Sequence, residues 1–379
     1  MLLNRIARLC CPVNRKSALA VSALAAALFF QAASASGAEN TGPGNVPCRK
    51  ARRLADRLGR SVVNVQVVGK GPSGNAVSLA SFSGFFWQPE EGKNPRDSKR
   101  WIVGCCPGLQ ALLKTKTNRM IVTCDNLVQR TAVFWAADPA TGLCLLTCKE
   151  VGKELPSLKL EPVCSLRRGL CVLTVANPSG VDHSARYGFT VGPVLAGCYG
   201  KCLAYKLDLD YVRGHEGGIV YAFDRGFAGV LLAAANRGTD AFLGGALAES
   251  RPVPAVVLPA AAVQRIARSL KERRAVERGW VGLQLSVSSG GNGKLVIHVK
   301  SVAAGSPAQQ AALSPGDRIL SVRGRKLVSL DDLYELGLWV EYEGVGKELV
   351  FEVASPDGAP RTATVRISSE PNPAQNLPR

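Results

Sequence analysis

The sequence predicts a mainly β protein, with two β-barrels followed by a smaller third domain. Between residues 61 and 260, short apolar segments alternate with turn residues at intervals of roughly 8 to 12 residues, which is typical of barrels. Helical spacing of apolar residues marks the two flanking stretches, 48–60 and 263–278. Residues 279–368 then show a separate helix–turn–strand pattern. At 379 residues, the chain has room for two or three domains.

The first 35 residues have the features of a signal peptide. An apolar run at 17–30 is short for a membrane-spanning helix, and a small-x-small cleavage site follows at 33–35. The basic residues before this run are Arg5, Arg8, Arg15 and Lys16. We therefore expect residues 1–35 to be removed and the mature protein to be soluble in the periplasm or another extracytoplasmic space. An uncleaved anchor is the alternative.

Two basic helices are expected to flank the barrels. Residues 36–60 contain a polar lead and the first helix, and residues 261–278 form a helical linker. The inward face of the first helix is expected to hold Ala51, Leu54, Ala55 and Leu58. The formal net charge of +18 is compatible with contact to anionic surfaces. No nucleic-acid partner is expected, because the protein is exported and no aromatic residues interleave the charges.

The first barrel is expected to span residues 61–154 and the second barrel residues 155–260. In the first barrel, the apolar segments that we interpret as strands are 61–68, 76–87, 101–103, 119–123 and 131–135. In the second barrel, the informative segments are 169–180, 190–192 and 257–259. A helix from Ala260 to Arg274 is predicted to lead out of the barrels.

Ten cysteines remain after removal of the signal peptide, and an even count in an oxidising compartment favours disulfides. These are Cys48, Cys105, Cys106, Cys124, Cys144, Cys148, Cys164, Cys171, Cys198 and Cys202. Cys198 and Cys202 flank a plausible turn and are the first candidate pair. Zinc is the rival, but the chain has three histidines and no Cys-x-x-Cys pair. We expect neither a metal nor another cofactor.

Residues 279–368 resemble a PDZ domain. Gly305–Ala308 and Ala312–Leu320 reproduce its helix–turn–strand block, and Leu330–Leu333 follows at the expected spacing. Ser329 and Asp332 form a capping box that should open the second helix. Residues 369–379, rich in Pro and Asn, are expected to be a disordered tail.

The stretch Arg213–Val220 combines a Gly-x-x-Gly-Gly turn with an apolar strand. Such a turn aims successive N–H groups at one point, and a Cβ would block the approach. With segments 82–87, 137–146 and 169–180, it resembles the periplasmic high-temperature-requirement (HtrA/Deg) serine proteases. The resemblance covers nearly the whole mature chain in family order. It implies a trypsin-like double β-barrel followed by one PDZ domain.

All three positions of the catalytic triad that this resemblance implies are replaced. Pro107 stands in place of the histidine, Gly142 in place of the aspartate and Glu216 in place of the serine. No histidine precedes His183, so the first barrel lacks a general base under any alignment. The remnant oxyanion turn consists of Gly214, His215 and Gly217. We therefore expect a pseudoprotease that does not hydrolyse peptide bonds.

The peptide-binding part of the resemblance is intact. In PDZ domains, a C-terminal strand adds to a sheet edge and its carboxylate is bound by N–H groups of a Gly-containing loop. The resemblance assigns this loop to Trp280, Val281, Gly282 and Leu283. Leu333 and Leu336 would flank the side-chain pocket, although a core role for both is equally open. Arg278, just before the loop, is expected to contribute a screened surface charge.

The function predicted first is binding of C-terminal or extended peptides as an adaptor, chaperone-like protein or regulator. One alternative is an active endopeptidase with a rearranged site. Another is a structural envelope protein that contacts anionic surfaces. The oligomeric state is not decided by the sequence. The resemblance implies a homo-oligomer, because the family commonly forms trimers through aromatic contacts of an N-terminal segment. Residues 39–60, however, contain no aromatic residue.

Overall fold

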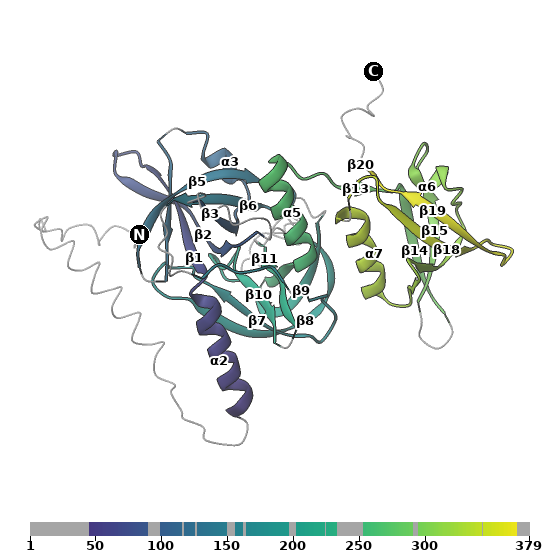
Figure 1. The fold of residues 1–379 in the computed structure, drawn as a ribbon, viewed down its shortest axis with the longest axis horizontal. Helices are drawn as coiled ribbons and strands as arrows, with labels where there is room; N and C mark the ends of the chain where they lie inside the picture. The colour runs from purple at the N-terminus through teal and green to yellow at the C-terminus, as the bar shows by residue number, and fades with distance from the viewer. Residues whose placement is uncertain are drawn as a thin grey trace, which may run out of the picture. The chain divides into compact units, whose positions relative to one another are not determined.

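A computed structural model describes eleven segments of the chain, and Figure 1 shows their fold. The described residues are 45–89, 99–115, 117–125, 127–149, 156–161, 164–196, 202–223, 225–232, 253–290, 295–342 and 344–369. The predicted signal peptide and most of the predicted tail lie outside them. The described residues from 51 to 369 belong to one compact unit. In the described part of the chain, no helix has the length and apolar character needed to cross a membrane.

The first barrel closes through six antiparallel strands in the order β1-β2-β3-β6-β5-β4. Apolar and β-branched residues favour these strands, and alternate side chains point into the barrel. The strands are β1 (Val62–Lys70), β2 (Ala76–Trp87), β3 (Lys99–Cys105), β4 (Arg119–Thr123), β5 (Gln129–Ala137) and β6 (Leu143–Lys149). The short helix α3 (Leu109–Leu112) follows β3.

The second barrel closes in the order β10-β11-β12-β9-β8-β7. Its strands are β7 (Cys171–Ala176), β8 (Ser184–Ala196), β9 (Cys202–Asp210), β10 (Ile219–Ala222), β11 (Gly226–Leu231) and β12 (Pro254–Pro259). Together with the third domain, the two closed barrels confirm the predicted mainly β fold.

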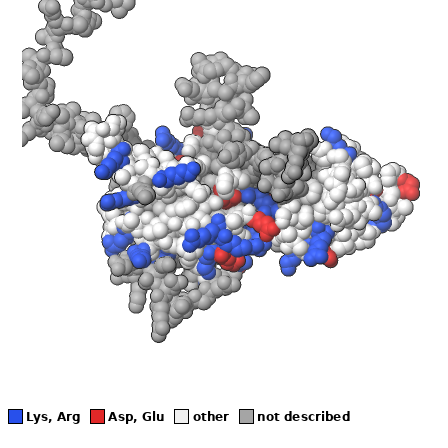
Figure 2. Space-filling model, turned by 90° about the horizontal axis from the view of Figure 1, so that it is seen from above, with Lys and Arg blue, Asp and Glu red and all other residues white. Residues whose placement is uncertain are grey.

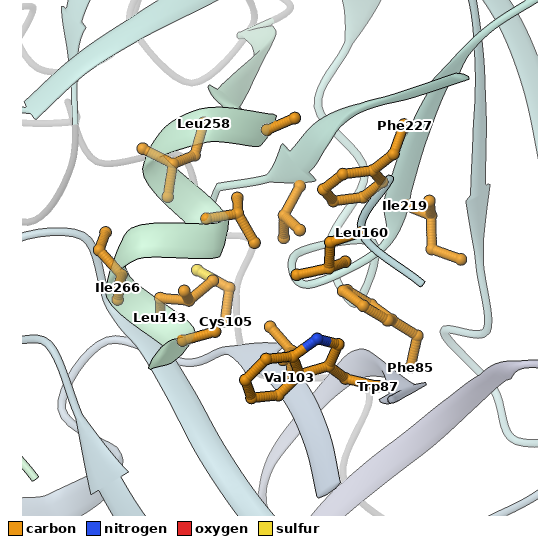
Figure 3. Close-up of a cluster of buried hydrophobic side chains, with 14 of the residues drawn as sticks. Phe85, Trp87, Val103, Cys105, Leu143, Leu160, Ile219, Phe227, Leu258 and Ile266 are labelled. Atoms are coloured by element: carbon orange, nitrogen blue, oxygen red, sulfur yellow. The ribbon is translucent and has the colours of Figure 1, made fainter. Parts of the chain in front are cut away.

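One hydrophobic cluster joins the two barrels (Figure 3). Phe85 of β2 faces Phe227 of β11, with ring centroids 6.1 Å apart. Ile266 of helix α5 (Ala260–Arg273) packs into the same cluster. Each barrel therefore contributes buried side chains to one shared core.

The two basic helices have the predicted amphipathic character. In α2 (Asn45–Gly59), the four apolar residues expected to face inward are buried, and Arg52, Arg53 and Arg57 are exposed. Figure 2 shows one face of the molecule, where Lys and Arg side chains form several separate groups.

The third domain is a sheet in the order β14-β15-β16-β18-β19, covered by helix α7 (Leu330–Tyr342). The predicted capping box is confirmed: Ser329 N–H donates to Asp332 Oδ2 at 3.0 Å, and Asp332 N–H donates to Ser329 Oγ at 3.2 Å. The remaining elements are β13 (Gly279–Trp280), β14 (Leu283–Ser289), β15 (Leu295–Val302), α6 (Pro307–Gln310), β16 (Arg318–Val322), β17 (Arg325–Lys326), β18 (Glu348–Ala354), β19 (Pro360–Arg366) and β20 (Ser368–Ser369).

Candidate functional site

The Gly-x-x-Gly-Gly stretch forms a tight turn between β9 and β10. Gly214 and Gly217 have left-handed φ values of 88° and 83°, which glycine adopts without steric cost. The Gly218 N–H donates to the His215 carbonyl at 2.9 Å, which closes the turn. The Ser83 N–H of β2 donates to the Glu216 carbonyl at 2.9 Å, so the turn is also fixed to the first barrel.

The Glu216 side chain folds back onto this turn. The Gly214 N–H donates to Glu216 Oε2 at 2.6 Å, and the Tyr211 hydroxyl donates to the same oxygen at 3.1 Å. In trypsin-like proteases, the oxyanion hole uses the N–H groups of the nucleophile and of the glycine two positions earlier. Here the carboxylate of Glu216 takes up the donor of Gly214.

Burial controls the protonation of this turn. It raises the pKa of Glu216, against the opposing effect of the hydrogen bonds from its own N–H, Tyr211 and Gly214. Burial also lowers the pKa of His215, and the charge of Arg186 lowers it further. His215 is therefore a neutral imidazole at neutral pH, and no serine or cysteine lies in the turn for it to activate.

The other two triad positions lie against each other on neighbouring segments. The Cys106 N–H donates to the Gly142 carbonyl at 2.9 Å. Gly142 has a φ of 76°, and a Cβ built on it would come within 2.9 Å of Pro107 Cγ. The end of β3 also reaches the turn, because a Cβ on Gly217 would lie 2.7 Å from the Cys105 nitrogen. The structure thus brings the three predicted positions together, with neither a serine nor a histidine among them.

Among the described residues, a small cavity adjoins Glu216. The cavity bordered by Tyr211, His215, Glu216 and Leu231 has a volume of about 10 Å³. Such a volume holds about one water molecule.

Restoring the triad by Pro107→His, Gly142→Asp and Glu216→Ser together is expected to give no hydrolysis of fluorescent casein. Aspartate at position 142 would need a left-handed backbone, which costs roughly 1–2 kcal/mol, and the cavity that the described residues form beside position 216 has a volume of about 10 Å³. The matched control carries the first two substitutions with Glu216→Ala. Hydrolysis above that control would show that the turn retains a competent geometry.

A second candidate site is an apolar pocket of about 400 Å³ between β14 and α7. Five of the six residues predicted to bind peptide line it: Trp280, Val281, Leu283, Leu333 and Leu336. The sixth, Gly282, lies in the loop between β13 and β14 with a left-handed φ of 77°. A Cβ on Gly282 would come within 2.2 Å of Ser306 Cβ, so packing within the domain already requires glycine there.

The expectation that Arg278 provides a screened surface charge is wrong. Its guanidinium forms a two-pronged ion pair with Asp138, at 2.6 and 3.1 Å, and Nε donates to Glu341 Oε1 at 2.8 Å. The Asp138 side chain is 1% exposed and that of Arg278 is 18% exposed. Burial opposes the charge of Arg278, but hydrogen bonding to Asp138 raises its pKa overall. Arg278 therefore connects the loop before β6 to helix α7 through ion pairs.

No local sequence pattern indicates this ion pair. Asp138 precedes Pro139, and an Asp-Pro pair commonly forms a turn. Asp138 does accept hydrogen bonds from the Thr141 N–H and hydroxyl, at 3.3 and 2.6 Å. Its buried position and its partnership with a residue of the linker follow from tertiary structure alone.

The described cysteine side chains are thiols, and all but Cys171 are buried. Burial raises the pKa of Cys202 to about 12, so it is a poor nucleophile at neutral pH. Cys198 lies outside the described residues, so the predicted Cys198–Cys202 pair stays a prediction. No group of three or more metal-ligating side chains forms a metal site within the described segments.

Comparison with known protein families and sequences relates the chain to proteases. The PDZ domain family matches residues 269–334. A protein of Hahella chejuensis named as a probable DegP-like periplasmic serine endoprotease is 24% identical, over 72% of this chain and 61% of its own length. The corresponding protein of Pseudomonas putida strain W619 is 26% identical over 58% of this chain and 46% of its own length. The chain thus spans about half to three fifths of these relatives.

Solved structures share the fold. The HtrA-type protease AlgW with a tripeptide aligns with a TM-score of 0.54 and 19% identity, covering 86% of this chain and 98% of the other. AlgW with a decapeptide aligns with a TM-score of 0.53 and 18% identity, covering 85% and 99%. At this identity, the comparison supports the order of two barrels and a PDZ domain.

Proposed function

We propose that this chain, an HtrA-family protein with one PDZ domain, binds C-terminal or extended segments of other proteins and does not hydrolyse them. The proposal that the chain does not hydrolyse peptides rests on the Glu216 carboxylate, which accepts the hydrogen bond of the Gly214 N–H. An oxyanion would need that donor, and a carboxylate beside it would repel the developing negative charge. The names of the relatives point to hydrolysis, but Pro107, Gly142 and Glu216 carry none of its chemistry.

The pocket between β14 and α7 supports the proposal that the chain binds peptides. Leu283 and Leu285 line it from the strand, and Leu333 and Leu336 line it from the helix. A peptide strand added beside β14 would place alternate side chains toward this apolar surface, while its carboxylate approaches the loop at Gly282. The protein would then act as an adaptor, a chaperone-like protein or a regulator in the extracytoplasmic space to which its relatives are assigned.

C-terminal amidation of a bound peptide is expected to weaken binding at least tenfold, because it removes the charge that the loop would bind. Isothermal titration of the mature protein would use decapeptides ending in Leu, Val or Phe, each as free acid and amide. Leu333→Asp should abolish binding of the free acid. Val350→Asp, at an exposed position of β18 outside the pocket, is the matched control and should leave it unchanged.

Equal affinity of the amide and the free acid would refute carboxylate recognition and leave internal segments as the ligand. Binding that survives Leu333→Asp would place the peptide site elsewhere.

A further inference from the structure

A second pocket, of about 330 Å³, lies between helices α5 and α7. Its volume is within the usual range for small-molecule sites. It uses a different set of α7 residues from the PDZ pocket: Leu333, Leu336 and Gly337 line the first, whereas Tyr334, Leu338 and Trp339 line the second. The two pockets can therefore be tested independently, and nothing in the proposed peptide binding uses the second.

The two walls of this second pocket differ in chemistry. Helix α5 contributes Arg265 and Arg268, which lie three residues apart and therefore on one face of the helix. Helix α7 contributes the aromatic rings of Tyr334, Trp339 and Tyr342. A ligand between the helices would meet guanidinium groups on one side and aromatic rings on the other.

The charges around the pocket favour an anion. Glu335 is an acidic side chain in its lining, and Arg325 forms an ion pair with it. The guanidinium of Arg325 also lies 5.9 Å from the centre of the Trp339 ring, and that of Arg323 lies 5.5 Å from it. Arg325 also forms an ion pair with Asp332, so it is shared between two carboxylates. The pocket lining itself, with Arg265, Arg268 and Glu335, carries one net formal positive charge.

We propose that this second pocket binds a small organic anion with a planar apolar body, that is, an aromatic carboxylate. The carboxylate pairs with Arg265, whose planar guanidinium matches two carboxylate oxygens at once. The ring of the ligand packs against Trp339 and Tyr342, which supply apolar area and a stacking surface.

Isothermal titration of the mature protein with indole-3-acetate tests this proposal. The neutral isostere indole-3-acetamide is expected to bind at least tenfold more weakly, because it lacks the charge that Arg265 binds. Arg265→Gln should weaken indole-3-acetate by at least tenfold, whereas Arg265→Lys should retain part of the affinity. Arg273→Gln, which removes an exposed arginine of the same helix outside the pocket, is the matched control and should bind as the unaltered protein does.

Leu333→Asp in the PDZ pocket should leave indole-3-acetate binding unchanged, which separates this site from the proposed peptide site. Thermal unfolding of each variant shows whether it is folded, and Arg265→Lys carries the test if Arg265→Gln does not fold. The proposal is overturned if indole-3-acetate does not bind, if the amide binds equally well, or if the Arg265 variants bind with unchanged affinity.

Discussion

Replacement of Arg278 by methionine is expected to lower the free energy of unfolding by about 3 kcal/mol or more. Asp138 is almost completely buried and would lose the partner of its charge, and removing one member of a buried ion pair typically costs roughly 3–5 kcal/mol. Glu341 would lose the 2.8 Å hydrogen bond from Nε as well. Equilibrium unfolding in urea measures the change.

Two further variants identify the cause. Arg273→Met removes an exposed arginine five residues earlier and should change the stability by less than about 0.5 kcal/mol. Adding Asp138→Asn to Arg278→Met should recover part of the loss, because no unpaired charge then remains buried. If Arg278→Met lowers the free energy of unfolding no more than Arg273→Met does, the ion pairs of Arg278 with Asp138 and Glu341 contribute nothing to stability.

Replacement of Gly217 by alanine is expected to destabilise the junction between the barrels by about 3 kcal/mol. The new Cβ would lie 1.9 Å from the Ser83 carbonyl oxygen, which is backbone and cannot rotate away, and the φ of 83° adds strain. Gly217 is therefore required by packing, whether or not the turn has any catalytic role.

Gly108→Ala is the matched control for this substitution. Gly108 also has a left-handed φ, of 75°, but no atom lies within 4 Å of the position of a Cβ. It should show the backbone strain alone, roughly 1–2 kcal/mol. Equal losses in the two variants, measured by thermal unfolding, would contradict the packing argument.

The features that could be predicted from the sequence are local. Alternating apolar residues identified β1, β2 and β4 closely, and the helical spacing after Pro259 placed α5 to within one residue of its end. The capping box at Ser329 likewise depends on residues three apart. Glycines at 214 and 217 indicated a turn because left-handed φ values favour glycine.

The features that could not be predicted depend on residues far apart in the chain. Arg278 and Asp138 are 140 residues apart, and no periodicity marks a partner at that separation. The fold-back of Glu216 depends on Tyr211 and on the approach of Ser83 from the other barrel. Gly282 was expected to serve the ligand, but its contact with Ser306 arises only once β13, β14 and α6 have packed.

The most direct measurement is hydrolysis of unfolded casein by the mature protein while a free-acid peptide saturates its PDZ pocket, with the products resolved by mass spectrometry. The account predicts intact casein and a rate equal to that of Glu216→Ala. Turnover clearly above that variant, in protein free of contaminating protease, would show that the turn around Glu216 supports catalysis and would contradict the account.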